Sequence, residues 1–327
     1  LEDGIILQVH AYDYDKAMKV IEDIRLELGT DATKDEKVDI KKILVPVDFS
    51  EHSINACYYA IELASLFKAE IRLFHSYYIP TLDAMSMGES PIYSSTIDEH
   101  LQSIKDSATE NIEMLNKSLQ EHVEKSNIKG ILIDYKLEKG FAEDEIFDEY
   151  NNYEPDIIVM GTSGRNEKKK YLYGSVTAEV IENVKVPVFA IPSKAKGGLQ
   201  SFKKIMYATR FDETDFRAVH KLIYLVSPFD MQIHFVHISS EKDEKMKGEQ
   251  VELIKERLRK ANVSTDIKID TIESADIVES FDGYIRKNDI DIVSMVTHKR
   301  NFITRWLNPS LTRKMLFHSN TPLLVFH

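Results

Sequence analysis

The chain has 327 residues, of which 43% are hydrophobic and 29% charged, and its formal net charge is −12. At roughly 150 residues per domain, this length predicts two domains, each large enough to bury a sizeable core. An acidic chain lacks the concentrated excess of Lys and Arg that binds a phosphate backbone, so we do not expect nucleic acid as the main partner.

The cysteine content and the lengths of the apolar runs indicate a cytoplasmic protein. Cys57 is the single cysteine, which excludes an intrachain disulfide and favours a reducing compartment. No run approaches the roughly 20 apolar residues that span a bilayer, so we expect no membrane partner. The N-terminus lacks a basic flank followed by a long apolar stretch, so we expect no signal peptide.

Residues 1–40 form an N-terminal extension that differs in pattern from the rest of the chain. Residues 5–9 are apolar enough for a short strand, and residues 15–28 have the spacing of an amphipathic helix. Residues 29–39 are polar and begin with a glycine, which is typical of a linker. The pattern assigns this extension no function beyond that of an appended docking arm.

From residue 41 onward, short apolar runs typical of buried strands alternate with helical patterns. We expect strands at residues 42–47, 71–75, 131–137, 156–160 and 186–191, and helices capped by Ser50 and at residues 97–125, 143–150 and 175–183. This alternation indicates a mainly parallel five-stranded sheet with helices on both faces, for which the doubly wound arrangement is the default. Residues 41–193 are therefore expected to form a first α/β domain.

The same pattern restarts after a linker at residues 194–200, which contains two adjacent glycines. Residues 204–209, 232–237, 291–295 and 320–325 resemble strands of the first domain. Ile43 aligns with Ile205 at an offset of 162 residues. Met160 aligns with Met295 at an offset of 135, so the first copy carries 27 extra residues in its middle. Residues 201–327 are therefore interpreted as a second copy of the domain.

The extra residues of the first copy include the stretch from Tyr78 to Thr96, which holds two Met, two Pro and one Gly. This stretch follows a predicted strand, so it lies where the carboxyl ends of the strands open. A loop of that length is either a lid or a disordered segment, and the sequence leaves both alternatives open.

The stretch most informative about chemistry spans residues 160–177, between a predicted strand and a predicted helix. Gly161 and Gly164 lack side chains, which lets a ligand approach the backbone closely. Gly174 and Ser175 stand at the helix N-terminus, where unpaired N–H groups and the helix dipole favour an anion such as phosphate. The sequence therefore predicts a phosphate-binding loop.

This loop resembles the ATP-binding loop of the universal stress protein family, whose pattern is Gly-x2-Gly-x9-Gly-(Ser/Thr). Gly161, Gly164, Gly174 and Ser175 match every fixed position, with nine residues between the second and third glycines. The element order of residues 41–193 is similar as well, and that of residues 201–327 more weakly so. The resemblance implies two tandem α/β sandwiches of the adenine nucleotide alpha hydrolase-like class.

The resemblance also implies which residues surround the nucleotide. In nucleotide-binding members an Asp after the first strand contacts the adenine, and Asp48 occupies that place. The other residues implied to lie near the nucleotide are Val47, Ser76, Met160, Val176 and Thr177. ATP would be the cofactor, together with Mg or Mn. The competing interpretation, that the glycines only shape a tight loop and Asp48 caps the first helix, stays open.

The second domain departs from the pattern at nearly every ligand position. Val296, Lys299 and Pro309 replace the three glycines, Arg210 replaces the Asp, and Ser310 alone keeps its match. Side chains at the glycine positions obstruct the approach of phosphate, and a proline removes an N–H donor. We therefore predict that the second domain does not bind ATP in the family's manner.

Three other motifs are missing or incomplete. The chain has no Gly-x4-Gly-Lys-(Ser/Thr) loop, which argues against a P-loop NTPase, and no Gly-x-Gly-x2-Gly after a strand. Arg165 stands where a nucleophile elbow needs its final glycine, so Ser163 is a poor nucleophile candidate.

Together these patterns predict an ATP-binding stress-response protein that acts by nucleotide-dependent conformation or choice of a protein partner. The alternatives are an interaction module that binds no nucleotide and a slow ATPase; no catalytic residue is assigned. In the family the last strand often pairs across a dimer axis, so residues 186–191 and 322–326 are expected to pair within the chain as a pseudo-dimer. A homodimer of the whole chain is a further alternative.

Overall fold

The computed structural model divides the chain into two compact units, residues 1–39 and residues 40–327. The structure describes residues 40–78, 91–162, 175–195, 197–209, 213–239, 266–273, 277–296 and 321–327. The strand and helix expected within residues 1–39 lie outside these ranges. None of the helices in the described ranges is long and apolar enough to cross a membrane.

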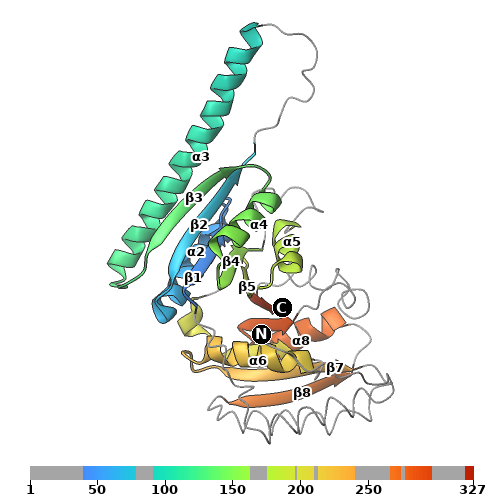
Figure 1. The fold of residues 1–327 in the computed structure, drawn as a ribbon. Helices are drawn as coiled ribbons and strands as arrows, with labels where there is room; N and C mark the ends of the chain where they lie inside the picture. The colour runs from blue at the N-terminus through green and yellow to red at the C-terminus, as the bar shows by residue number, and fades with distance from the viewer. Residues whose placement is uncertain are drawn as a thin grey trace, which may run out of the picture. The chain divides into compact units, whose positions relative to one another are not determined.

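The second unit is built on one ten-stranded sheet to which each repeat contributes five strands (Figure 1). The first repeat supplies β1 (Lys42–Pro46), β2 (Glu70–Tyr77), β3 (Ile133–Lys139), β4 (Ile157–Gly161) and β5 (Val188–Ile191). The second supplies β6 (Lys204–Ala208), β7 (Gln232–Ser239), β8 (Ile267–Glu273), β9 (Ile292–Val296) and β10 (Leu323–Phe326). The order is β3-β2-β1-β4-β5-β10-β9-β6-β7-β8, and the pairings within each repeat are parallel. The fold class predicted from the sequence is therefore confirmed.

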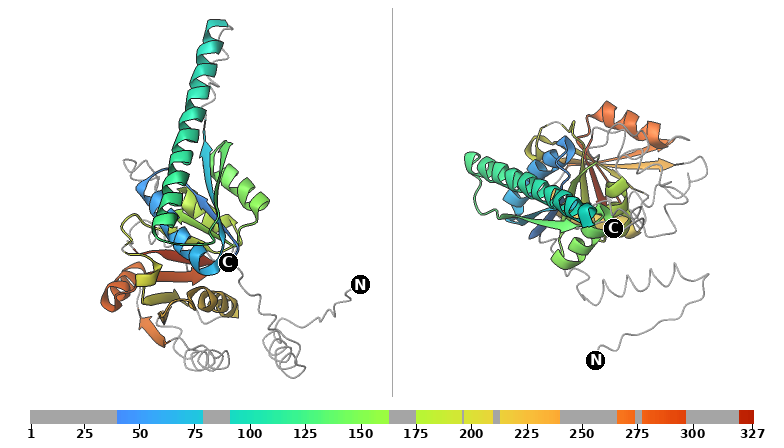
Figure 2. Two further views of the ribbon diagram at one scale, coloured as in Figure 1. Left: turned by 90° about the vertical axis from the view of Figure 1, so that its left-hand side faces the viewer. Right: turned by 90° about the horizontal axis from the view of Figure 1, so that it is seen from above.

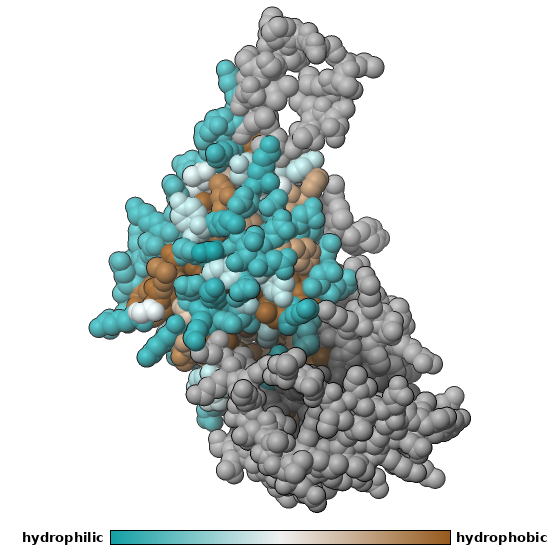
Figure 3. All heavy atoms as spheres, viewed as in Figure 1, coloured by the Kyte–Doolittle hydropathy of each residue, from teal (hydrophilic) through white to brown (hydrophobic). Residues whose placement is uncertain are grey.

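Helices of the first repeat cover both faces of this sheet (Figures 1 and 2). Helices α2 (Glu51–Phe67) and α3 (Pro91–Lys125) lie on one face, and α4 (Ala142–Tyr153) and α5 (Ser175–Asn183) on the other. The second repeat has α6 (Glu213–Val226) and α8 (Ile277–Asn288), and the short 3-10 helix η3 (Leu199–Ser201) leads into it. Covered on both faces, the strands need apolar side chains in both directions, which explains the continuous apolar runs of the sequence. The outward surface around α4 is largely hydrophilic (Figure 3).

An antiparallel pairing of β5 with β10 joins the two repeats edge to edge. Leu323 lies opposite Ala190, and Val325 lies opposite Val188. Both valines are fully buried, and one apolar cluster contains residues from both repeats. The intrachain pseudo-dimer predicted from the sequence is therefore confirmed.

The two repeats share hydrogen bonds at the positions that the sequence offsets align. Oδ2 of Asp156 accepts from the amides of residues 41 and 42, at 2.7 and 2.9 Å, and Oδ2 of Asp291 does the same for residues 203 and 204. His75 and His237 each place Nδ1 against a carbonyl at the end of the neighbouring central strand, at 2.7 and 3.0 Å. The two histidines therefore have the same structural role in both repeats.

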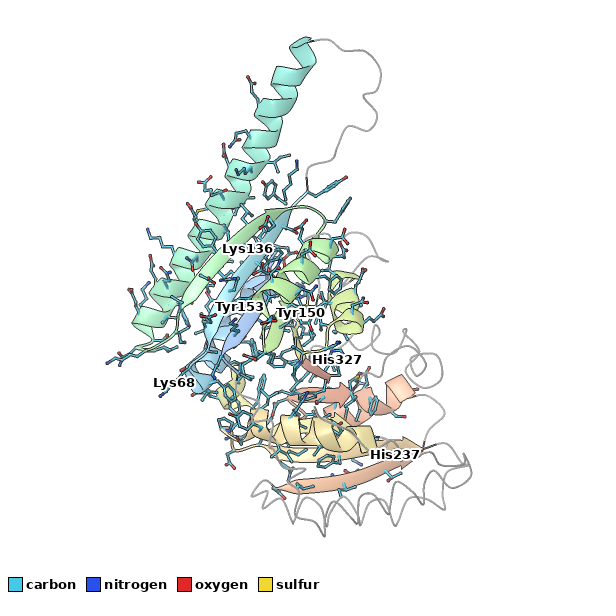
Figure 4. The ribbon with its side chains drawn as sticks, in the orientation of Figure 1. Lys68, Lys136, Tyr150, Tyr153, His237 and His327 are labelled. Atoms are coloured by element: carbon cyan, nitrogen blue, oxygen red, sulfur yellow. The ribbon has the colours of Figure 1, made fainter. Side chains whose placement is uncertain are left out.

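Below α4 and α8 the repeats carry different polar networks at equivalent positions. Glu149 is 1% exposed, and its two carboxylate oxygens bind Lys136 at 2.6 Å and Arg72 at 3.2 Å. Lys136 lies on β3 under α4 (Figure 4). In the second repeat Tyr284 replaces the glutamate and His234 the arginine, and Nδ1 of the histidine lies 2.8 Å from the tyrosine hydroxyl. A buried carboxylate needs such paired cations, because an unpaired charge in the core is strongly destabilising.

The extra residues of the first repeat are partly helical. Helix α3 is 35 residues long and begins at Pro91, six residues before the predicted start at Ile97, so this part of the predicted loop was assigned wrongly. Proline is well tolerated in the first turn of a helix, where its missing N–H would have no partner. The choice between lid and disorder falls on residues 79–90, outside the described ranges. The N-terminal part of α3 extends past the edge of the sheet (Figure 1).

We predict that Cys57 is unreactive in the native protein. The side chain is 1% exposed on α2, its thiol donates to the carbonyl of Ser53, and burial raises the pKa of the thiol to about 12. The thiolate is the reactive form, so an aromatic disulfide reagent at pH 8 should label the protein only as fast as it unfolds. Rapid labelling in native buffer would contradict this assignment to the core.

Candidate functional site

The candidate site lies where the strand order of the first repeat reverses. β1 pairs with β2 on one side and β4 on the other, so the connections leave these strands in opposite directions. Ligands of doubly wound sheets bind outside the carboxyl ends of strands at such a switch point. The register between β1 and β4 pairs Ile43 with Ile157 and Leu44 with Ile158. Extended by the same offset toward the carboxyl ends of the strands, it places Val47 opposite Gly161. The structure therefore brings together the end of β1, which Asp48 follows, and the end of β4, where the glycine pattern begins.

Asp48 is held by the N-terminus of α2. Oδ1 of Asp48 accepts from the backbone N–H of Ser50 at 3.1 Å and from its hydroxyl at 2.6 Å. Ser50 is the N-cap of α2, as the sequence predicts, and its side chain accepts from the amide of Ser53 at 3.3 Å. Ser50 is therefore the cap of α2, and Asp48 binds Ser50. These hydrogen bonds fix the carboxylate of Asp48 next to the end of β1.

Phe49 is a residue of this corner that the sequence did not single out. It has a φ of 62°, in the left-handed region, which costs a bulky side chain roughly 1–2 kcal/mol. Its ring packs on that of His75 at a centroid distance of 4.4 Å. This strained turn directs the chain from β1 into α2, and strained residues of this kind cluster at functional sites. The signal available in the sequence was an aromatic residue beside the candidate ligand Asp48.

Gly161 ends β4 directly against the first turn of α2. A Cβ at this position would lie 2.8 Å from the backbone carbon of His52 and 2.9 Å from the amide nitrogen of Ser53. The sequence argument gave room for a ligand as the reason for this glycine. In the structure, the close approach of α2 already requires it.

Thr177 ties the far end of the loop back to its beginning. Its hydroxyl donates to the carbonyl of Gly161 at 2.7 Å, and the side chain is buried. On the other side, the amide of Thr162 donates to the carbonyl of Ile191 at 3.1 Å. We call Gly161, Thr162 and Thr177 the neck of the loop. The neck therefore joins the end of β4 to the first turn of α5.

The remaining predicted residues contribute in different ways. Val47 and Met160 are buried, whereas Ser76 and Val176 are half-buried. Ser175 begins α5, and the first N–H groups of a helix have no acceptor within it. Gly164 and Gly174 lie outside the described residues, as does the basic run at residues 168–170.

Two further aromatic residues lie at the same edge of the sheet. Tyr78 follows β2, and Phe141 precedes α4. Their rings stack at a centroid distance of 4.2 Å, and both remain about half exposed. No local pattern in the sequence indicates this pair, because the contact joins segments 63 residues apart.

The corresponding corner of the second repeat is built differently. Val296 ends β9 where Gly161 ends β4, and Thr209 stands where Val47 does. The other substituted positions, namely Arg210, Lys299 and Pro309, lie outside the described residues, as does the matching Ser310. Among the residues that the structure describes, no group of three or more His, Cys, Asp or Glu side chains is arranged to hold a metal ion.

We predict that Gly161→Ala destabilises the protein by roughly 1–3 kcal/mol, because the new methyl group overlaps the backbone of α2. Denaturant unfolding measures this change. Gly283→Ala is the matched control: a Cβ there meets nothing within 4 Å, and alanine is the better helix former. Equal effects of the two substitutions would show that the contact with α2 is not tight.

Known proteins with similar sequences belong to the family that the loop pattern resembles. The model of the universal stress protein family matches residues 39–192 and 201–327. Universal stress protein MJ0531 of Methanocaldococcus jannaschii is 30% identical over 158 residues, which is 48% of this chain and 84% of that protein. Universal stress protein MJ0577 of the same organism is 27% identical over 165 residues, 47% of this chain and 96% of the relative.

Among solved structures, a universal stress protein from Archaeoglobus fulgidus superimposes with a TM-score of 0.61 at 18% identity. The superposition covers 88% of this chain and 97% of the other, so the fold likeness extends over both repeats. With two matches of the family model in sequence, the chain belongs to the universal stress protein family as a tandem of two domains.

Proposed function

We propose that the first repeat binds ATP at the carboxyl ends of β1 and β4, and that the second repeat does not bind it in this manner. The protein would then act in the stress response through a nucleotide-dependent conformation or choice of partner. The observation that supports this proposal most is the tied neck. It joins Gly161 at the carboxyl end of β4 to Thr177 of α5 at the switch point of a doubly wound sheet, and the sequence between these two residues carries the Gly-x2-Gly-x9-Gly-Ser pattern.

The chemistry of the neck suits a phosphate chain. Helix α5 starts at Ser175, and the first N–H groups of a helix have no acceptor within it. These amides and the helix dipole attract an anion, and the loop adds basic residues at 168–170. Asp48, held by Ser50, would accept from the exocyclic amine of the adenine. A divalent cation, Mg or Mn, would neutralise the remaining phosphate charge.

In the second repeat the same sequence positions argue against this mode of binding. Val296 places a side chain at the end of β9, where the first repeat has Gly161. Pro309 stands at the position of Gly174 and has no N–H to donate. One nucleotide per chain is therefore the expected stoichiometry.

We predict that Gly174→Val weakens binding of Mg·ATP to the full chain by tenfold or more, about 1.4 kcal/mol, because a branched side chain enters the space of the phosphates. Titration calorimetry measures the affinity. Pro309→Val, at the equivalent position of the second repeat, should bind as the parent protein does. A parent protein without affinity, or an unchanged affinity in Gly174→Val, would contradict the proposed site.

We predict that Thr177→Val weakens ATP binding by roughly fivefold to tenfold, since it removes the hydroxyl that ties the neck and keeps the volume of the side chain. Thr177→Ser keeps the hydroxyl and should restore most of the affinity. Thr312→Val is the control, because Thr312 occupies the same place after the degenerate loop. If Thr177→Ser were as weak as Thr177→Val, the hydrogen bond would not be what holds the loop.

A further inference from the structure

The segment that joins the two repeats is fixed along one face of α2. His52, Asn55, Tyr59 and Glu62 are spaced by three, four and three residues, so their side chains lie on one side of the helix. They contact residues 192–195 and 197–200, which we call the strap. The sequence analysis interpreted most of this segment as a polar linker, whereas the structure shows it held by hydrogen bonds.

Each of the four side chains makes at least one polar contact with the strap. Nδ1 of His52 accepts from the amide of Ser193 at 3.1 Å, and Nδ2 of Asn55 donates to the carbonyl of Pro192 at 3.0 Å. The hydroxyl of Tyr59 donates to the carbonyl of Gly197 at 3.0 Å, and Oε2 of Glu62 accepts from the amide of Gln200 at 3.4 Å. The contacts follow the helix from its first turn almost to its end.

Burial adds to these hydrogen bonds. Tyr59 is fully buried between the rings of Phe189 and Phe202, at centroid distances of 6.0 and 5.9 Å, and burial raises the pKa of its hydroxyl to about 12. Leu199 and Phe202 of the adjoining chain are buried as well.

Two glycines fit the strap to this helix. Gly197 has a φ of 75°, which side-chain-bearing residues rarely adopt. A Cβ on Gly198 would lie 2.0 Å from Oε1 of Glu62. The conformation of the strap is therefore specified by its sequence.

At its upper end the strap meets the neck of the loop. His52, which binds Ser193, is also the residue whose backbone touches Gly161. Thr162 of the neck binds the carbonyl of Ile191, which directly precedes the strap. Because these contacts are already at van der Waals distance, a shift of the neck has to move the first turn of α2, the strap, or both.

At its lower end α2 reaches the second repeat. A helix of 17 residues is about 25 Å long, and the ring of Phe67, its last residue, stacks on Tyr224 of α6 at 6.0 Å. The strap itself continues through η3 into β6, the central strand of the second repeat. The same helix thus contacts the candidate nucleotide site and the partner repeat.

We propose that α2 and the strap couple the nucleotide site of the first repeat to the second repeat, an inference that rests on the proposed ATP binding. The two states are a docked strap, as in this structure, and a released one. ATP that holds the neck in place favours the docked state. By linkage, a change that populates the released state weakens ATP binding, and bound ATP in turn opposes release, although the strap does not touch the nucleotide.

Tyr59→Phe tests this coupling in the full chain. The substitution removes the hydroxyl that binds Gly197 and keeps the buried ring. We expect faster hydrogen exchange at the strap amides, including those of residues 193 and 200, and a threefold to tenfold weaker affinity for Mg·ATP. In the parent protein, saturating Mg·ATP should slow exchange at the same amides.

Tyr58→Phe is the matched control, because Tyr58 is the neighbouring residue and its ring packs on His122 of α3 and not on the strap. It should leave both strap exchange and ATP affinity unchanged. ATP binding that leaves strap exchange unaltered, together with parent-like affinity in Tyr59→Phe, would overturn the coupling and leave the proposed function standing. Absence of ATP binding in the parent protein would overturn both, and calorimetry on that protein alone distinguishes the two failures.

Discussion

The packing of Gly161 against the first turn of α2 is the constraint on which the arrangement of this site depends. It fixes the end of β4 beside the end of β1, so that Thr177 can close the neck by its hydrogen bond to the Gly161 carbonyl. It also fixes the same helix turn that presents the Ser50 cap and, through it, the carboxylate of Asp48. One backbone contact therefore positions the neck, the candidate adenine ligand and the upper end of the strap.

The two repeats show which parts of this arrangement serve the fold and which serve the site. The hydrogen bonds of Asp156 and Asp291, and those of His75 and His237, are the same in both copies. These contacts hold the central strands and are independent of any ligand. The polar networks under α4 and α8 and the corners at the carboxyl ends differ. We interpret the second repeat as a scaffold that completes the ten-stranded sheet through β10 and whose sequence lacks the three glycines of the loop.

Local patterns predicted most of the fold, because buried parallel strands and capped helices leave strong signals in sequence. The strand alternation, the Ser50 cap and the partnership of β5 with β10 were all predicted. β3 was placed two residues too early, at 131 instead of 133, since the apolar run 131–133 suggested full burial. Leu132 is in fact 61% exposed before an edge strand. The start of α3 was missed because its first turn follows a proline within a stretch that appeared to be a loop.

The features of the site that the sequence could not supply depend on contacts between distant segments. The glycine pattern located the loop, but the reason for Gly161 is a helix turn more than 100 residues away. The docking of the strap on His52, Asn55, Tyr59 and Glu62 depends on pairs separated by about 140 residues, and no local pattern carries that information.

Whether nucleotide occupies the junction is decided most directly by a crystal structure of the full chain with Mg²⁺ and a non-hydrolysable ATP analogue. We expect the phosphates at the N-terminus of α5 and the base beside Asp48, with the second repeat empty; an analogue found elsewhere, or none bound at this junction, would contradict the account.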